Sequence, residues 1–144
     1  MTTLYFETSA FVKLLVVEPG SRTAVRAWDS GYPVTASGLL FVEARASLAA
    51  AHRGRRMTSS SLAEARHDLA RLRQHVNEID ADSLVLAQAE ELAEQEALRG
   101  YDAVHLAPAL WASAEVLVTA DDGSSRPPSA KASRWSTLAT RTDR

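Results

Sequence analysis

The stretch that decides the fold is Leu4-Tyr5-Phe6-Glu7-Thr8-Ser9-Ala10-Phe11-Val12-Lys13-Leu14-Leu15. It begins as a short apolar run, which favours a buried strand, and a carboxylate ends the run. Thr8 or Ser9 can then cap a helix through its hydroxyl, and apolar side chains continue at helical spacing. A strand followed at once by a helix predicts an α/β unit, in which ligands bind beyond the carboxyl ends of the strands. Glu7 would lie at that end; taken alone, it is better explained as a solvated acid, and the other acids along the chain change that interpretation.

Composition restricts the class of protein. The chain has 144 residues, 46% hydrophobic and 24% charged, which suits one globular domain. It has no cysteine, so it has no disulfide or thiolate site, and we expect a cytoplasmic protein. No apolar run is long enough for a membrane span, and no signal peptide is evident at the N-terminus. The net charge of −2 does not by itself indicate nucleic-acid binding, although a local basic patch remains compatible with it.

Strand and helix patterns alternate along the rest of the chain. The patterns predict strands over residues 34–37, 76–80 and 116–119, and helices after Ser21, from about Leu39 to Arg53, behind a capping box at Ser61–Glu64, after Asp82 and from Asp102. This alternation predicts one α/β domain over residues 1–122. Pro127 and Pro128 exclude a helix in the segment that follows, so residues 123–144 are expected to be an atypical tail, loop or loosely docked.

Four carboxylates occupy comparable places in these predicted elements. Glu7 and Asp121 end strands, and Glu43 and Asp102 lie on early turns of helices. Because strand ends and the following helix starts meet along one edge of an α/β sheet, we expect the four carboxyl groups within roughly 4–8 Å of one another. A hard divalent cation relieves their mutual repulsion, and oxygen ligands indicate Mg²⁺ or Mn²⁺ rather than zinc. Such a site suits phosphoryl chemistry.

Two further groups of residues are open to more than one interpretation. His105 follows Asp102 by three residues and can face the same pocket, but we expect a partly buried histidine bonded to backbone. Arg53, Arg55 and Arg56 can hold RNA phosphates. They are equally explained as solvated side chains that complement the dipole at a helix end.

Four blocks of sequence resemble the PIN-domain ribonucleases, in particular the VapC-type toxins of toxin–antitoxin pairs. The blocks are Phe6–Leu14, Val42–Arg45, Leu98–Ala107 and Leu117–Asp121, and the third is the most specific. The resemblance implies a central parallel sheet with helices on both faces. It also implies a magnesium-dependent endoribonuclease, usually a homodimer, which a cognate antitoxin silences.

The resemblance also assigns roles to residues of this chain. The four acids of the family map onto Glu7, Glu43, Asp102 and Asp121, as metal ligands and catalytic groups. Small polar residues near them map onto Thr8, Ser9 and Thr119, which would orient the carboxylates. We expect positively charged side chains around the site to hold the RNA backbone. The candidates are Lys13, Arg45, Arg53, Arg55, Arg56 and Arg99.

Two departures from the family pattern define the alternatives. The first acid of the family is normally Asp, whereas this chain has Glu7, and residues 123–128 replace an expected helix. Our leading hypothesis is a metal-dependent RNA endonuclease that acts as a toxin. The alternative is a catalytically weakened PIN-like module that binds antitoxin or RNA without efficient cleavage. A metal-dependent phosphatase or a phospho-receiver domain is a third option. The chain lacks the second acid after Glu7 that the phosphatase would need, and the Lys after the last strand that the receiver domain would need.

Overall fold

The computed structural model describes residues 2–120 and 136–139 of the chain. Within these residues, five strands form one sheet in the order β3-β2-β1-β4-β5, and every neighbouring pair is parallel. The strands are β1 (Leu4–Phe6), β2 (Val34–Ser37), β3 (Val76–Ile79), β4 (Val116–Thr119) and β5 (Ser136–Ala139). Since β1 is central and its neighbours all run parallel to it, the residues that follow β1, β2 and β4 reach the same edge of the sheet.

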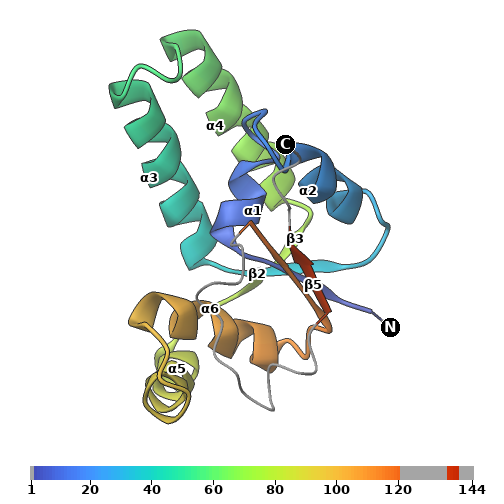
Figure 1. The fold of residues 1–144 in the computed structure, drawn as a ribbon, viewed down its shortest axis with the longest axis vertical. Coiled ribbons are helices and arrows are strands. Elements are labelled where there is room, and N and C mark those ends of the chain that lie inside the picture. Colours follow the sequence, from blue (N-terminus) through green and yellow to red (C-terminus); the bar gives the residue numbers. More distant parts are fainter. Residues whose placement is uncertain (1, 121–135, 140–144) are drawn as a thin grey trace.

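Helices cover both faces of this sheet (Figure 1). They are α1 (Thr8–Val12), α2 (Ser21–Trp28), α3 (Leu39–Arg53), α4 (Ser59–Arg73), α5 (Ser83–Gln95) and α6 (Gly100–Trp111). The first four lie on one face, where α3 and α4 form a long hairpin, and α5 and α6 pack together on the other (Figure 1).

The alternation of β1 explains the two layers. Leu4 and Phe6 point into the larger core with Phe11, whereas Tyr5 points to the opposite face, towards Ala109 of α6. In the larger core, the ring of Phe11 makes edge-to-face contacts with Phe6, Trp28 and Phe41, with ring centroids 5.8–6.2 Å apart. This aromatic cluster fixes α1 directly behind the end of β1.

Most of the predicted elements are confirmed. The strand over residues 34–37 and the helix from Leu39 to Arg53 agree with the prediction at both ends, and Gly54 follows that helix. Asp82 caps α5, as expected, by accepting hydrogen bonds from the N–H groups of Leu84 and Val85. The central parallel sheet with helices on both faces, which the resemblance implies, is present.

Three local predictions are wrong. Neither Thr8 nor Ser9 caps α1, because Glu7 is the N-cap residue and no side chain accepts a capping hydrogen bond there. The capping box at Ser61–Glu64 does not begin α4, because Thr58 is the N-cap and its hydroxyl accepts the N–H of Ser61. Within the tail, residues 136–139 are not loop: they form β5, parallel to β4. A strand at this place uses backbone groups of β4, so the apolar content of the tail could not reveal it.

The domain boundary and the absence of a membrane span are the remaining expectations about the fold. Residues 121–135 and 140–144 lie outside the described residues, so the domain boundary at 122 stays a prediction. In the described part of the chain, no helix has the length and apolar character needed to cross a bilayer.

Candidate functional site

The predicted acids come from elements that meet at the carboxyl edge of the sheet. Glu7 follows β1 directly, and its N–H donates to the carbonyl of Val118 in β4 at 3.0 Å. Glu43 lies on the second turn of α3, which follows β2 after a single glycine, and Asp102 lies on the first turn of α6. Glu7 and Glu43 both act electrostatically on the hydroxyl groups of Tyr5 and Tyr101, so these two acids face a common region.

Glu43 is held by two donors from α6. His105 Nε2 lies 2.8 Å from Glu43 Oε1, and Glu43 also accepts a hydrogen bond from the hydroxyl of Tyr101. Tyr101 and His105 are four residues apart on one helical face, with ring centroids 5.1 Å apart. The Glu43 side chain is 26% exposed while His105 is fully buried, so the carboxylate stands between a rigid interior and the open edge of the sheet.

Behind His105, a buried hydrogen-bonded chain continues to the sheet. The Tyr5 hydroxyl lies 3.1 Å from His105 Nδ1 and accepts the backbone N–H of Ser37 at 3.3 Å. Burial raises the pKa of Tyr5 well above its usual value, and the nearby Glu7 and Glu43 raise it further. Burial and the bond to Glu43 likewise raise the pKa of Tyr101. Both tyrosines therefore keep their protons and act as hydrogen-bond donors at physiological pH.

The predicted small polar residues hold the neighbouring backbone. Ser9 Oγ accepts the N–H of Ala120 at 3.1 Å and lies 3.4 Å from Thr119 Oγ1, so α1 is joined to the end of β4. Thr8 is buried beside Tyr101, and its hydroxyl lowers the pKa of that tyrosine slightly without reaching full hydrogen-bond geometry. A hollow of about 360 Å³ opens here, with Thr8, Ser9, Tyr101 and Ala120 among its lining residues.

The fit of these residues to a divalent metal is partial. Glu7, Glu43 and Thr8 supply oxygen atoms, the donor type that magnesium and manganese prefer. Asp102 is instead paired with Arg99, whose Nε lies 3.0 Å from its Oδ2. Among the described residues, no three His, Cys, Asp or Glu side chains are grouped closely enough to hold a metal ion. The fourth predicted acid, Asp121, lies outside the described residues, so the spacing of the complete set stays a prediction.

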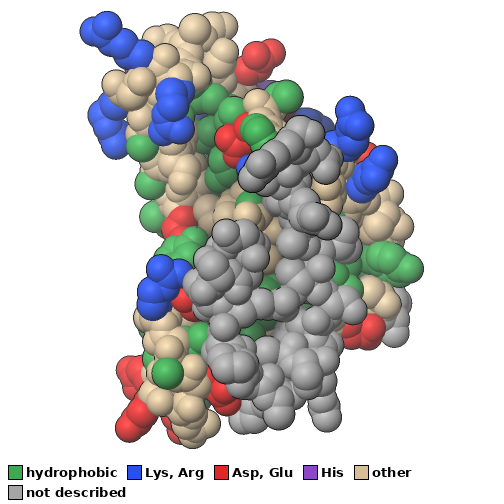
Figure 2. Space-filling model, in the orientation of Figure 1, with side chains coloured by type: hydrophobic (Ala, Val, Ile, Leu, Met, Phe, Trp, Pro, Cys, Tyr) green, Lys and Arg blue, Asp and Glu red, His purple; other side chains and the backbone are tan. Residues whose placement is uncertain are grey.

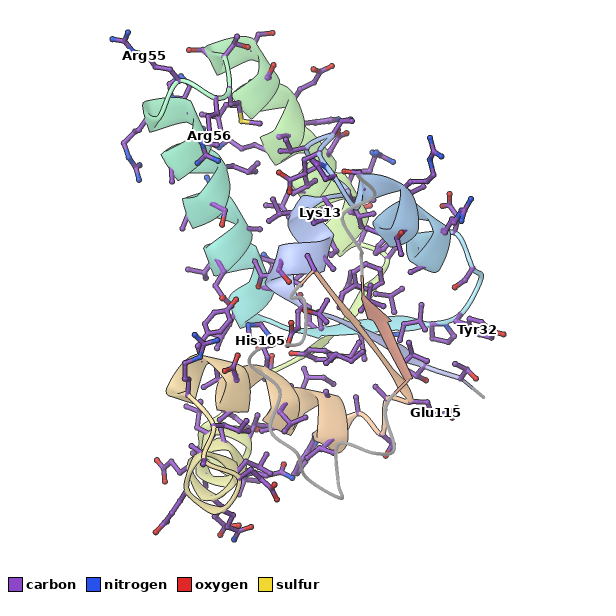
Figure 3. All side chains as sticks on the ribbon, in the orientation of Figure 1. Lys13, Tyr32, Arg55, Arg56, His105 and Glu115 are labelled. Atoms are coloured by element: carbon purple, nitrogen blue, oxygen red, sulfur yellow. The ribbon has the colours of Figure 1, made fainter. Side chains whose placement is uncertain are left out.

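The predicted basic residues do not form one rim. Lys13 lines the hollow but is bonded to Glu18 and to the carbonyl of Pro19. Arg45 lines a separate groove between α3 and α4. Arg53, Arg55 and Arg56 lie at the far end of α3, and Figure 3 shows the last two well away from His105. Lys and Arg side chains gather over that end in Figure 2.

The sequence did not assign a role to Tyr5, Tyr101 or His105. The expectation of a partly buried histidine bonded to backbone is wrong, because His105 is 1% exposed and bonds two side chains. The spacing of Tyr101 and His105, four residues apart in the same block as Asp102, was the available signal. No such signal marked Tyr5, because a tyrosine in a strand is ordinarily part of the core.

Comparison with known proteins decides the family. The PIN domain family model matches residues 4–128, most of the chain. This chain belongs to the PIN domain family. The PIN domain is 42% identical over 120 residues to two curated proteins of Mycobacterium tuberculosis, Ribonuclease VapC45 (strain CDC 1551 / Oshkosh) and Ribonuclease VapC49 (strain ATCC 25618 / H37Rv). Each alignment covers 83% of this chain and 83% of the relative.

Solved structures share the fold at lower sequence identity. A toxin–antitoxin complex from Klebsiella pneumoniae contains a chain with a TM-score of 0.64 and 18% identity. The similarity covers 94% of this PIN domain and 97% of that chain. It supports the α/β architecture described above.

Proposed function

We propose that this PIN domain is a metal-dependent endoribonuclease that acts as the toxin of a toxin–antitoxin pair. The observation that carries the proposal is the placement of Glu43, a carboxylate fixed by His105 and Tyr101 at the edge of the sheet that Glu7 also reaches. An acid held in this way suits the transfer of a proton from an attacking water. The two VapC ribonucleases that share 42% of aligned residues support RNA as the substrate.

In this proposal Glu7, Asp102 and Asp121 hold the cation, with Glu43 next to them. A divalent cation, magnesium with manganese as a substitute, would supply activation of water and stabilisation of charge on the phosphate. Glu43 positions the attacking water or accepts its proton. Asp102 takes part through Oδ1, the oxygen that Arg99 does not contact, and the largely exposed guanidinium of Arg99 can bind an RNA phosphate at the rim.

Ser9 and Thr119 keep the ligand-bearing backbone in place, and Thr8 is proposed to orient the neighbouring carboxylates. The bond from Ala120 N–H to Ser9 Oγ fixes the end of β4 immediately before Asp121. Side chains of this kind orient the ligands of a metal without touching it. Lys13, Arg45, Arg53, Arg55 and Arg56 are proposed as contacts for more distant phosphates, through charge rather than base recognition.

The proposed protein partners are an antitoxin and a second copy of the chain. A groove of about 660 Å³ lies between the residues after α1 and the tip of the α3–α4 hairpin. Leu15, Val16 and the almost fully exposed Val17 give it an apolar wall, and its charged lining has both signs, with Arg55 and Arg56 beside Glu64 and Asp68. This surface suits an amphipathic antitoxin segment. Phe11, in the helix that precedes this wall, is fully buried and does not take part.

The function is tested by incubating purified protein with total cellular RNA in magnesium, in manganese and in chelator. We expect cleavage with either metal and none with chelator. Glu43→Gln should remove most of the activity, whereas Glu94→Gln, on the exposed side of α5, should leave it unchanged. Cleavage that persists in chelator, or that Glu43→Gln leaves intact, would contradict the proposal.

The weakened binding module remains the second candidate, and two observations favour it. Glu7 stands where the family normally has Asp, and Asp102 is engaged by Arg99. Such a protein would bind the antitoxin and RNA but cut slowly. Expression of the chain alone separates the candidates: growth arrest that depends on Glu43 supports the nuclease, and tight RNA binding without cleavage supports the module.

A further inference from the structure

We propose that His105 is a positioning residue for Glu43: its Nε2 donates to the carboxylate, and Tyr5 orients the ring by donating to Nδ1. The role in cleavage rests on the proposed nuclease function. The direction of these hydrogen bonds does not, since it follows from their donors and acceptors alone.

The direction of each hydrogen bond follows from its donors. The backbone N–H of Ser37 can only donate, so the Tyr5 oxygen accepts it. The hydroxyl proton of Tyr5 is then directed to His105 Nδ1 at 3.1 Å, which accepts it. On the other side of the ring, the carboxylate of Glu43 can only accept, so His105 Nε2 donates to Glu43 Oε1 at 2.8 Å.

The opposite direction of the bond between Tyr5 and His105 would leave a buried group unsatisfied. If Nδ1 carried a proton, it would donate to the Tyr5 oxygen, which already accepts the Ser37 N–H. The hydroxyl proton of Tyr5 would then have no acceptor in its chain, and Tyr5 is fully buried, so water cannot replace one. A buried donor without a partner destabilises the folded protein by about 1–3 kcal/mol. The hydrogen bonds that lead from Ser37 through Tyr5 and His105 to Glu43 therefore satisfy every buried donor only when they run in one direction.

The location of His105 excludes a direct role on the substrate. It is 1% exposed and lies behind Glu43, so RNA cannot reach its ring. What it controls is the carboxylate, which it connects to Tyr5 of β1 and through Tyr5 to the end of β2. In Figure 3, His105 projects from α6 towards the first turns of α3. Glu43 is thereby fixed relative to β1, which Glu7 follows, and to β2, which α3 follows.

Two amide variants separate this role from simple packing. In His105→Gln the amide nitrogen takes about the place of Nε2 and can donate to Glu43. In His105→Asn the shorter amide ends near the place of Nδ1 and cannot reach Glu43. We expect His105→Asn to lower kcat about 10–100-fold with KM nearly unchanged, and His105→Gln to restore most of it. A merely structural histidine would not show this rescue by the longer amide.

The protonation pattern has a readout of its own. Long-range proton–nitrogen NMR correlation of the His105 imidazole distinguishes a proton on Nε2 from one on Nδ1, without RNA or metal. We expect Nε2 to carry a proton in the unmodified protein, because Glu43 can only accept. In Tyr5→Phe the Nε2–H should remain, while the Nδ1 resonance should shift because Nδ1 loses its donor. Tyr32→Phe, on the exposed loop before β2, is the matched control and should leave the His105 signals unchanged.

The outcomes are distinct. An Nδ1 resonance that Tyr5→Phe leaves unchanged would overturn the bond from Tyr5, and an Nε2 without a proton would overturn the bond to Glu43. Equal loss of kcat in His105→Asn and His105→Gln, with both folded, would overturn the positioning role. If His105→Asn does not fold, the NMR comparison of the unmodified protein with Tyr5→Phe still decides. If the protein cuts no RNA under any condition, the proposed function fails, while the NMR result still confirms or overturns the hydrogen-bonded chain.

Discussion

Ser9 Oγ accepts a hydrogen bond from the N–H of Ala120 at 3.1 Å, across 111 residues of sequence. Ser9 belongs to the first turn of α1, and Ala120 is the residue that follows β4. The bond therefore joins the segment after Glu7 to the segment before Asp121, the two predicted ligands that follow neighbouring strands. If these acids share a metal, Ser9 sets the separation of the backbone that carries them.

Ser9→Ala should weaken metal binding. The substitution leaves the Ala120 N–H without its acceptor and releases the end of β4, and loss of such an orienting contact typically weakens metal affinity or activity about 10–100-fold. We would measure Mn²⁺ affinity by calorimetry. Ser60→Ala, at an exposed position of α4, is the control and should match the unmodified protein. Equal affinities for Ser9→Ala and Ser60→Ala would exclude this role.

Glu43→Gln should reduce RNA cleavage by a factor on the order of a hundred or more, because the amide can neither accept a proton nor bind a cation as a carboxylate does. Its oxygen can still accept the proton on His105 Nε2, so the fold should be preserved. Single-turnover cleavage rates and thermal unfolding measured on the same sample test both statements. A folded variant with undiminished cleavage would remove Glu43 from the mechanism.

Glu7→Asp should increase cleavage in magnesium. Glutamate reaches about 1.5 Å farther than aspartate, and a misplacement of about 1 Å can lower a rate on the order of a hundredfold. Magnesium demands near-ideal octahedral geometry, whereas manganese should recover part of the activity of the unmodified protein. Rates of both proteins in each metal provide the comparison. Equal rates in magnesium would show that the site tolerates the longer acid.

Tyr5 should make the fold sensitive to alkaline pH. In the folded protein the pKa of Tyr5 lies above the unfolded value of about 10. The contribution of Tyr5 to the free energy of unfolding is therefore fully present below about pH 10 and is lost as the pH rises beyond it. The loss reaches at most about 1.4 kcal/mol per pH unit for one such group. Tyr5→Phe should be less stable at neutral pH, yet lose less stability between about pH 9 and about pH 11. Urea unfolding across this range measures the difference; parallel curves would contradict it.

Phe11→Ala should destabilise the domain by about 3–5 kcal/mol, because it removes a fully buried ring that contacts Phe6, Trp28 and Phe41. Val17→Ala, at a side chain that is 97% exposed, should change stability by less than about 0.5 kcal/mol. The free energy of unfolding in urea compares the two. A small effect at Phe11 would mean that the aromatic cluster does not fix α1.

The sequence by itself determined the local elements and the chemical type of the candidate site. The apolar run before Glu7, the β-branched run at 116–119 and the long helix ending before Gly54 are all set by neighbours in the chain, through hydrophobic periodicity and capping. The resemblance to the PIN domain rested on the same short blocks, and the family match confirms it.

Only the tertiary structure decided which side chains support Glu43. Tyr5, Glu43 and His105 come from three elements, and the bonds from His105 to the other two span 100 and 62 residues. No local pattern encodes such a chain, because its energy arises when burial removes water and each donor must find an acceptor. The strand at 136–139 was hidden for a related reason. It depends on backbone groups of β4, which the local sequence of the tail does not specify as its partner.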